Sequence, residues 1–140
     1  MTEAIEAHLA AARQAREEGR VTDSRDAYAR AAALSREAGL PQLQAHALRH
    51  LSDIDREAGH ASEALGHAEQ AASVYRSKGP PLDLANALRL KALALGDLRR
   101  PDQAAAVWSE ARDLYAAEGI AAGVSECEAR LAAASRQARG

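Results

Sequence analysis

The sequence predicts an all-α fold, and three observations support that prediction. Alanine, the best helix former, supplies about a quarter of the 140 residues, while phenylalanine is absent. Glycine recurs at positions twenty residues apart, as expected where helices end, because glycine enters the left-handed conformation without steric cost. Pro41, Pro81 and Pro101 follow three of the breaks, and proline is tolerated in the first turn of a helix.

The helix stops can be read in order along the chain. The segments REEGR, REAGL, REAGH, RSKGP and AAEGI carry Gly19, Gly39, Gly59, Gly79 and Gly119, and only Arg99, in LRRPD, interrupts the series. A stop every twenty residues leaves about 17 residues of helix and a turn of about 3. The sequence therefore predicts seven antiparallel helices, over residues 3–18, 22–38, 41–58, 61–78, 81–98, 101–118 and 121–137.

Alternate helices resemble each other more than neighbouring helices do, so the repeating unit is a pair of helices forty residues long. Ala31, Ala71 and Ala111 coincide after each shift by forty, and Tyr75 coincides with Tyr115. One pair cannot bury its apolar face alone, whereas stacked pairs share a continuous core. We therefore expect one domain over 1–140, an α-α superhelix with units 1–40, 41–80 and 81–120 and a capping helix over 121–137. We expect it to be right-handed, with Ala71 and Ala111 at close helix contacts.

Composition excludes several classes of protein. The net charge is −2, and acids and bases alternate along the helices, which argues against a nucleic-acid-binding domain. No stretch has the roughly 18 apolar residues of a membrane span, and the N-terminal segment lacks the apolar core of a signal peptide. The single cysteine, Cys127, excludes an intramolecular disulfide. These points predict a soluble cytoplasmic protein that binds neither nucleic acid nor membranes.

The second unit resembles the tetratricopeptide repeat. Two large apolar residues three apart are followed by a small one, then by a Gly-x-x-x-acidic-Ala turn and a small residue on the second helix. These positions are Leu48, Leu51, Ser52, Gly59, Glu63, Ala64 and Ala71. The third unit keeps Leu88, Ala92, Ala104, Trp108 and Ala111, and the first keeps Gly19, Asp23, Tyr28 and Ala31. The family's common repeat is roughly 34 residues long, so this chain resembles its long-helix variants.

The resemblance implies a module for protein–protein interaction. In this family the first helix of each pair lines a concave groove that binds peptides. The residues expected to line the groove are Arg13, His46, Arg49, His50, Asp53, Asn86, Arg89, Leu90 and Leu93. Leucines flanked by arginines suit an acidic partner segment with apolar anchors. The alternative for Leu90 and Leu93 is that they pack against a neighbouring helix.

No constellation of reactive groups predicts an enzyme or a cofactor. Cys127 falls in the apolar stripe Val124, Cys127, Leu131, Ala134, which indicates a packed and inert thiol. His46, His50 and Asp53 have a spacing that suits metal ligands, but solvated groove residues explain it equally well, and we expect no metal. Gly119 and Gly123 lack the preceding strand of a phosphate-binding loop, and helix termini explain both.

The seventh helix leaves an alternative open. Its stripe is narrow enough for the preceding pair to cover, which predicts a cap and a monomeric or weakly self-associating chain. The exposed alanines Ala129, Ala132 and Ala133 would favour dimerisation instead. The other candidate functions are therefore a self-assembling structural element and a ligand-sensing fragment of a bacterial regulator.

Overall fold

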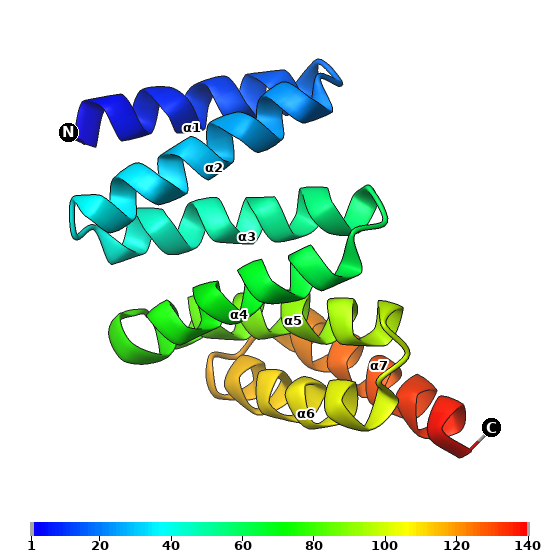
Figure 1. Ribbon diagram of the computed structural model, residues 1–140. Helices are drawn as coiled ribbons and strands as arrows, with labels where there is room; N and C mark the ends of the chain where they lie inside the picture. The colour runs from blue at the N-terminus through cyan, green and yellow to red at the C-terminus, as the bar shows by residue number, and fades with distance from the viewer. Residues whose placement is uncertain (1, 140) are drawn as a thin grey trace.

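The computed structural model describes residues 2–139, which form seven helices stacked in chain order (Figure 1). The helices are α1 (Thr2–Glu17), α2 (Val21–Glu37), α3 (Pro41–Glu57), α4 (Ala61–Lys78), α5 (Pro81–Asp97), α6 (Pro101–Ala117) and α7 (Ala121–Arg139). Each helix contacts the helices before and after it, and α3 also contacts α5. All seven predicted ranges are confirmed to within two residues, and residues 2–139 contain no strand. The chain is an all-helical repeat, as predicted.

The helix stops are made in two ways. Gly59 has a φ of +83°, and the next residue donates its N–H to the Asp55 carbonyl across 2.7 Å, which is a Schellman motif. Arg99 makes the same motif with a φ of +59°, although it is not glycine. Gly79 differs, since its φ is −108°. Pro80 follows it and has no N–H to donate, so the motif cannot close there.

Gly79 and Gly123 are required for space rather than for a left-handed turn. A Cβ on Gly79 would lie 2.4 Å from the ring of Tyr75, and a Cβ on Gly123 would lie 2.5 Å from the ring of Tyr115. Gly123 is the third residue of α7, so it lies at a helix terminus as predicted, and its lack of a side chain also serves packing. It lets α7 pack directly on Tyr115.

Alanine fills the closest helix contacts. Ala71 and Ala111 are both 0% exposed, which confirms their predicted burial. The aromatic residues Tyr28, Tyr75 and Trp108 extend from the even-numbered helices into the same core. Small alanines and large aromatic side chains thus share one core, which lets the helices approach closely.

The two ends of the stack expose polar or small residues where internal units bury apolar ones. Leu48 and Leu88 are buried, but the equivalent residue of α7 is the exposed Glu128. At the other end, the exposed Ala11 stands forty residues before the buried Leu51. This face of α1 is open to solvent, so the first unit needs no large apolar residue where the second unit has Leu51.

The stripe of α7 is confirmed as the face that packs on α6. Cys127 and Ala134 are buried, and Val124 and Leu131 are half-buried. The alanines off the stripe, Ala129, Ala132 and Ala133, are exposed. The outer face of α7 is therefore small and polar, which is typical of a terminal repeat in contact with water.

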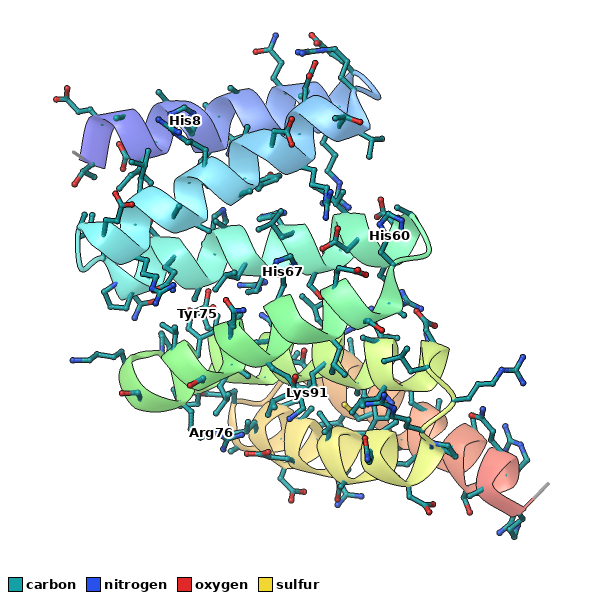
Figure 2. The ribbon with its side chains drawn as sticks, viewed as in Figure 1. His8, His60, His67, Tyr75, Arg76 and Lys91 are labelled. Atoms are coloured by element: carbon teal, nitrogen blue, oxygen red, sulfur yellow. The ribbon has the colours of Figure 1, made fainter. Side chains whose placement is uncertain are left out.

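A buried carboxylate joins the first unit to the second. Asp55 of α3 is 0% exposed; Arg25 Nε of α2 donates to its Oδ1 across 2.8 Å, and His67 Nδ1 of α4 lies 2.8 Å from its Oδ2. Figure 2 shows His67 between α3 and α4. The three side chains therefore fix α2, α3 and α4 relative to one another.

The junction between the second and third units carries aliphatic residues at the equivalent positions. Forty residues after Arg25, Asp55 and His67 stand three aliphatic residues, Leu65, Leu95 and Val107. All three belong to the hydrophobic core or pack against it. The same three repeat positions thus carry polar and charged side chains at the first junction and aliphatic ones at the second.

Arg99→Gly should raise the free energy of unfolding by about 0.5–1 kcal/mol, because glycine adopts a positive φ without the steric cost that arginine bears. Urea unfolding followed by circular dichroism measures the change. Arg36→Gly is the control, since Arg36 lies inside the last turn of α2, and glycine there should lower stability by about 1 kcal/mol. A loss of stability in Arg99→Gly would show that the turn does not need a left-handed residue.

The junction comparison predicts an asymmetry among variants of the Asp55 cluster. The double variant R25L/H67V leaves a buried carboxylate without partners and should lose about 3–5 kcal/mol. The triple variant R25L/D55L/H67V copies the apolar junction and should retain or exceed the original stability, as replaced buried ion pairs often do. Urea unfolding of both variants decides. Equal losses would mean that the first junction needs its ions to pack at all.

Candidate binding groove

The predicted groove residues gather around two hollows on the face lined by α1, α3 and α5. The first is a hollow of about 450 Å³, and Arg13, His46 and Arg49 are among its lining residues. The second, of about 180 Å³, is lined by Arg49, His50, Asp53, Asn86, Arg89 and Leu90. Arg49 lines both, so the two hollows adjoin along α3. Eight of the nine residues thus come together, while Leu93 lines a third hollow beside Trp108.

The two leucines are not open to a partner as the groove hypothesis expected. Leu90 and Leu93 are each 6% exposed and belong to the hydrophobic core. The physical reason is that α5 is covered along most of its length, so residues on successive faces of this helix are buried together. The packing alternative therefore describes both leucines, and apolar contact in the groove has to come from other residues.

Arg89 is already paired within the chain. Its guanidinium donates two hydrogen bonds to the carboxylate of Glu126 on α7, at 2.6 and 3.0 Å. This bidentate contact raises the pKa of Arg89 and lowers the pKa of Glu126. Arg89 therefore ties α5 to α7, and a partner would have to displace Glu126 to use it.

Arg49 is the groove arginine with unused hydrogen-bonding capacity. Its nearest acid is Asp83 of α5, with 3.8 Å between Arg49 Nη1 and Asp83 Oδ1. Its Nε is buried and has no hydrogen-bond partner among residues 2–139. A buried donor without an acceptor is costly. The groove therefore holds a donor that a bound acceptor would satisfy.

A stack of three rings lies beside Arg49. The His50 ring stacks on Tyr28 with centroids 4.8 Å apart and an interplanar angle of 6°, and His46 meets His50 edge to face at 4.7 Å. His50 Nδ1 is buried without a hydrogen-bond partner among residues 2–139. Burial, followed by the charge of neighbouring groups, lowers the pKa of His50 to about 4. The ring is therefore neutral near pH 7 and packs as a flat, weakly polar surface.

Asp53 and Asn86 give the second hollow its acidic and amide groups. Burial raises the pKa of Asp53. Asn86 Oδ1 accepts a hydrogen bond of 2.6 Å from the Tyr115 hydroxyl, which fixes the orientation of the amide. The amide nitrogen therefore remains as the group that Asn86 offers to the hollow.

Sequence reasoning missed three residues that shape these hollows. Tyr75, which Figure 2 labels, and Asp83 line the first hollow. The carboxylate of Glu126 accepts hydrogen bonds from the guanidinium of Arg89. Tyr75 lies on an even-numbered helix, which the family resemblance does not assign to the groove. The forty-residue spacing could have revealed a related pattern of ion pairs. Arg16–Glu57 and Arg56–Asp97 lie forty residues apart in the sequence, and each pair joins successive odd-numbered helices.

The described residues offer neither a cluster of metal ligands nor a reactive thiol. Between residues 2 and 139, no three His, Cys, Asp or Glu side chains gather closely enough to hold a metal ion. Cys127 is buried, as predicted, and burial raises the pKa of its thiol, which keeps it protonated and unreactive. No helix in the described range has the length and apolar character needed to cross a membrane.

No protein-family model and no curated protein matches the chain. Among solved structures, it is similar to the crystal structure of BtubC (BKLC) from P. vanneervenii, with a TM-score of 0.54 and 15% sequence identity. The alignment covers 97% of this chain and 65% of that one, so the chain spans somewhat less than two thirds of the neighbour's length. At this identity, the likeness concerns the fold alone.

The His50 environment predicts a stability that falls with acidification. Because the pKa of His50 drops from 6.5 to about 4 on folding, the unfolded chain binds the extra proton between these values. The stabilisation is complete above pH 6.5 and is lost as the pH falls towards 4, with a slope of up to about 1.4 kcal/mol per pH unit. Urea unfolding at several pH values measures it.

His50→Phe keeps a flat ring on Tyr28 but removes this titration, so its stability should depend less on pH. His60→Phe at an exposed position is the matched control and should keep the original slope. Identical slopes in all three proteins would contradict the assignment.

Proposed function

We propose that the chain is a tetratricopeptide-like repeat module that binds a segment of a partner protein along the hollows of α1, α3 and α5. The observation that carries the proposal is the convergence of side chains from three helices on two adjoining hollows that share Arg49. The buried, unpartnered Nε of Arg49 supports it, because a partner's carboxylate or carbonyl would satisfy that donor. The chain would act by binding and not by catalysis, in the cytoplasm.

The chemistry of the first hollow supports a segment with both acidic and apolar groups. Arg13 is exposed and makes no ion pair within residues 2–139, so it remains free for a carboxylate. Leu43 replaces Leu90 and Leu93 as the apolar contact, since it lines the first hollow and is only half-buried. Apolar contact would then supply most of the affinity, and the arginines would set the register of the bound segment.

The exposed polar residues at the ends of the helix stack argue against the alternative function, a self-assembling structural element. Glu128 stands where internal units carry a buried leucine, so stacking a second copy on α7 would bury a charge. This favours binding of another protein over end-to-end assembly. A monomeric or weakly associating chain remains the expectation.

A displayed library of random decapeptides tests the proposal. We expect enriched peptides to carry carboxylates beside apolar side chains, and R13E/R49E to weaken their binding by at least about tenfold through charge repulsion. R30E/R36E is the matched control, since both arginines are exposed on α2 and neither lines these hollows. It should leave binding unchanged.

Arg13→Glu alone guards against a folding defect, because Arg13 is exposed and its replacement breaks no ion pair described here. Circular dichroism verifies the helical content of each variant. Enriched peptides that bind R13E/R49E as tightly as the original chain would move the binding site away from these hollows.

A further inference from the structure

A crevice between α4 and α6 lies outside the groove and is unlike its counterpart one repeat earlier. It has a volume of about 350 Å³, with α5 as its floor. The residues that define it are Leu65, Glu69, Lys91, Leu95, Arg100 and Val107. Figure 2 shows Lys91 in the space between α4 and α6. We call this feature the junction crevice.

The junction crevice is open because the chain does not fill it. Its apolar residues, Leu65, Leu95 and Val107, are the repeat equivalents of Arg25, Asp55 and His67. At the first junction, the long Arg25 and His67 side chains converge on Asp55 and occupy the position. At the second, shorter aliphatic side chains line the same position; Leu95 is buried, and Leu65 and Val107 are half-buried.

The rim of the junction crevice is basic. Lys91 stands where the second unit has an apolar residue, and its Nζ is 3.8 Å from Glu69, a long contact between partly exposed groups. Such a pair is weak and readily exchanged. Arg100 is exposed and has no ion-pair partner among residues 2–139. Arg76 is paired with Glu110 at 2.7 Å, which links α4 to α6 and adds no net charge.

We propose that the junction crevice is a second docking surface, which takes a branched aliphatic side chain from an acidic peptide segment of a partner protein. The aliphatic group packs on the half-buried Leu65 and Val107, above the buried Leu95, and an adjacent carboxylate pairs with Arg100 and Lys91. Charge complementarity selects this partner, because an apolar floor with a net basic rim favours an apolar residue flanked by acids. The site does not depend on the groove of the odd-numbered helices.

The test uses three synthetic peptides and the full chain labelled with ¹⁵N. The peptides are acetyl-Glu-Leu-Leu-Glu-amide, its Gln-Leu-Leu-Gln analogue without charge, and its Glu-Ala-Ala-Glu analogue without leucine. We expect the first peptide to shift amide signals around Leu65, Leu95 and Val107, and both analogues to bind about tenfold more weakly or worse. NMR titration gives the location and the affinity together.

Two variants separate this site from the groove. Arg100→Glu reverses a rim charge, and Ala106→Trp adds bulk at an exposed residue that lines the crevice; each should weaken binding by about tenfold or more. Arg30→Glu and Ala33→Trp make the same changes at exposed positions of α2 and should not affect binding. R13E/R49E should also leave it unchanged, so failure of the groove proposal would be visible separately.

Four results would overturn the proposal. The first is a set of shifts that maps to the Arg13 and Arg49 hollow. The second is equal binding of the acidic and uncharged peptides. The third is the absence of any shift with the acidic peptide at millimolar concentration. Loss of binding in Ala33→Trp as well as Ala106→Trp would count against it too, because the effect would then not be local to the crevice.

Discussion

The helix stop that recurs about every twenty residues is the constraint on which the rest of this structure depends. Helices of nearly equal length, joined by tight turns, bring residues forty apart in sequence to equivalent positions in successive layers (Figure 1). This is why Arg16–Glu57 and Arg56–Asp97 repeat as ion pairs, and why residues of α1, α3 and α5 meet around shared hollows. An insertion of one residue within a helix would rotate every later side chain of that helix by about 100° relative to the earlier ones and separate these sets.

The two junctions show that one backbone arrangement tolerates opposite chemistry. Asp55 with Arg25 and His67 gives directional contacts that require one register, whereas Leu65, Leu95 and Val107 give contacts that many registers would satisfy. Buried ion pairs often add little net stability, because desolvation offsets the attraction. The value of the ionic junction would then lie in excluding other alignments of the first unit on the second, while the apolar junction leaves a surface available for other contacts.

Much of the fold could be predicted from the sequence, because helix stops and close alanine contacts are local features. The helix boundaries and the burial of Ala71 and Ala111 follow from them. The spacing alone could not predict that Arg99 adopts the left-handed conformation while Gly79 does not. For Gly79, the reason is that the following Pro80 has no N–H with which to close the Schellman motif. The site was harder to predict. Whether Arg89 is already paired depends on where α7 lies relative to α5, and whether Leu90 faces solvent depends on how α5 is covered, and both are tertiary relationships.

The polar end faces have a consequence for how such a chain can change its length. Internal layers meet at apolar seams that include the buried Leu48, Leu51 and Leu88. The exposed Glu128 of α7 stands at the repeat position of Leu48 and Leu88, and the exposed Ala11 of α1 stands at the repeat position of Leu51. A duplicated forty-residue segment inserted between layers would therefore meet complementary seams on both sides, and the existing ends would still face water. Growth by internal duplication thus needs no new terminal sequence, whereas growth by addition at either end would first require large apolar residues at those exposed positions.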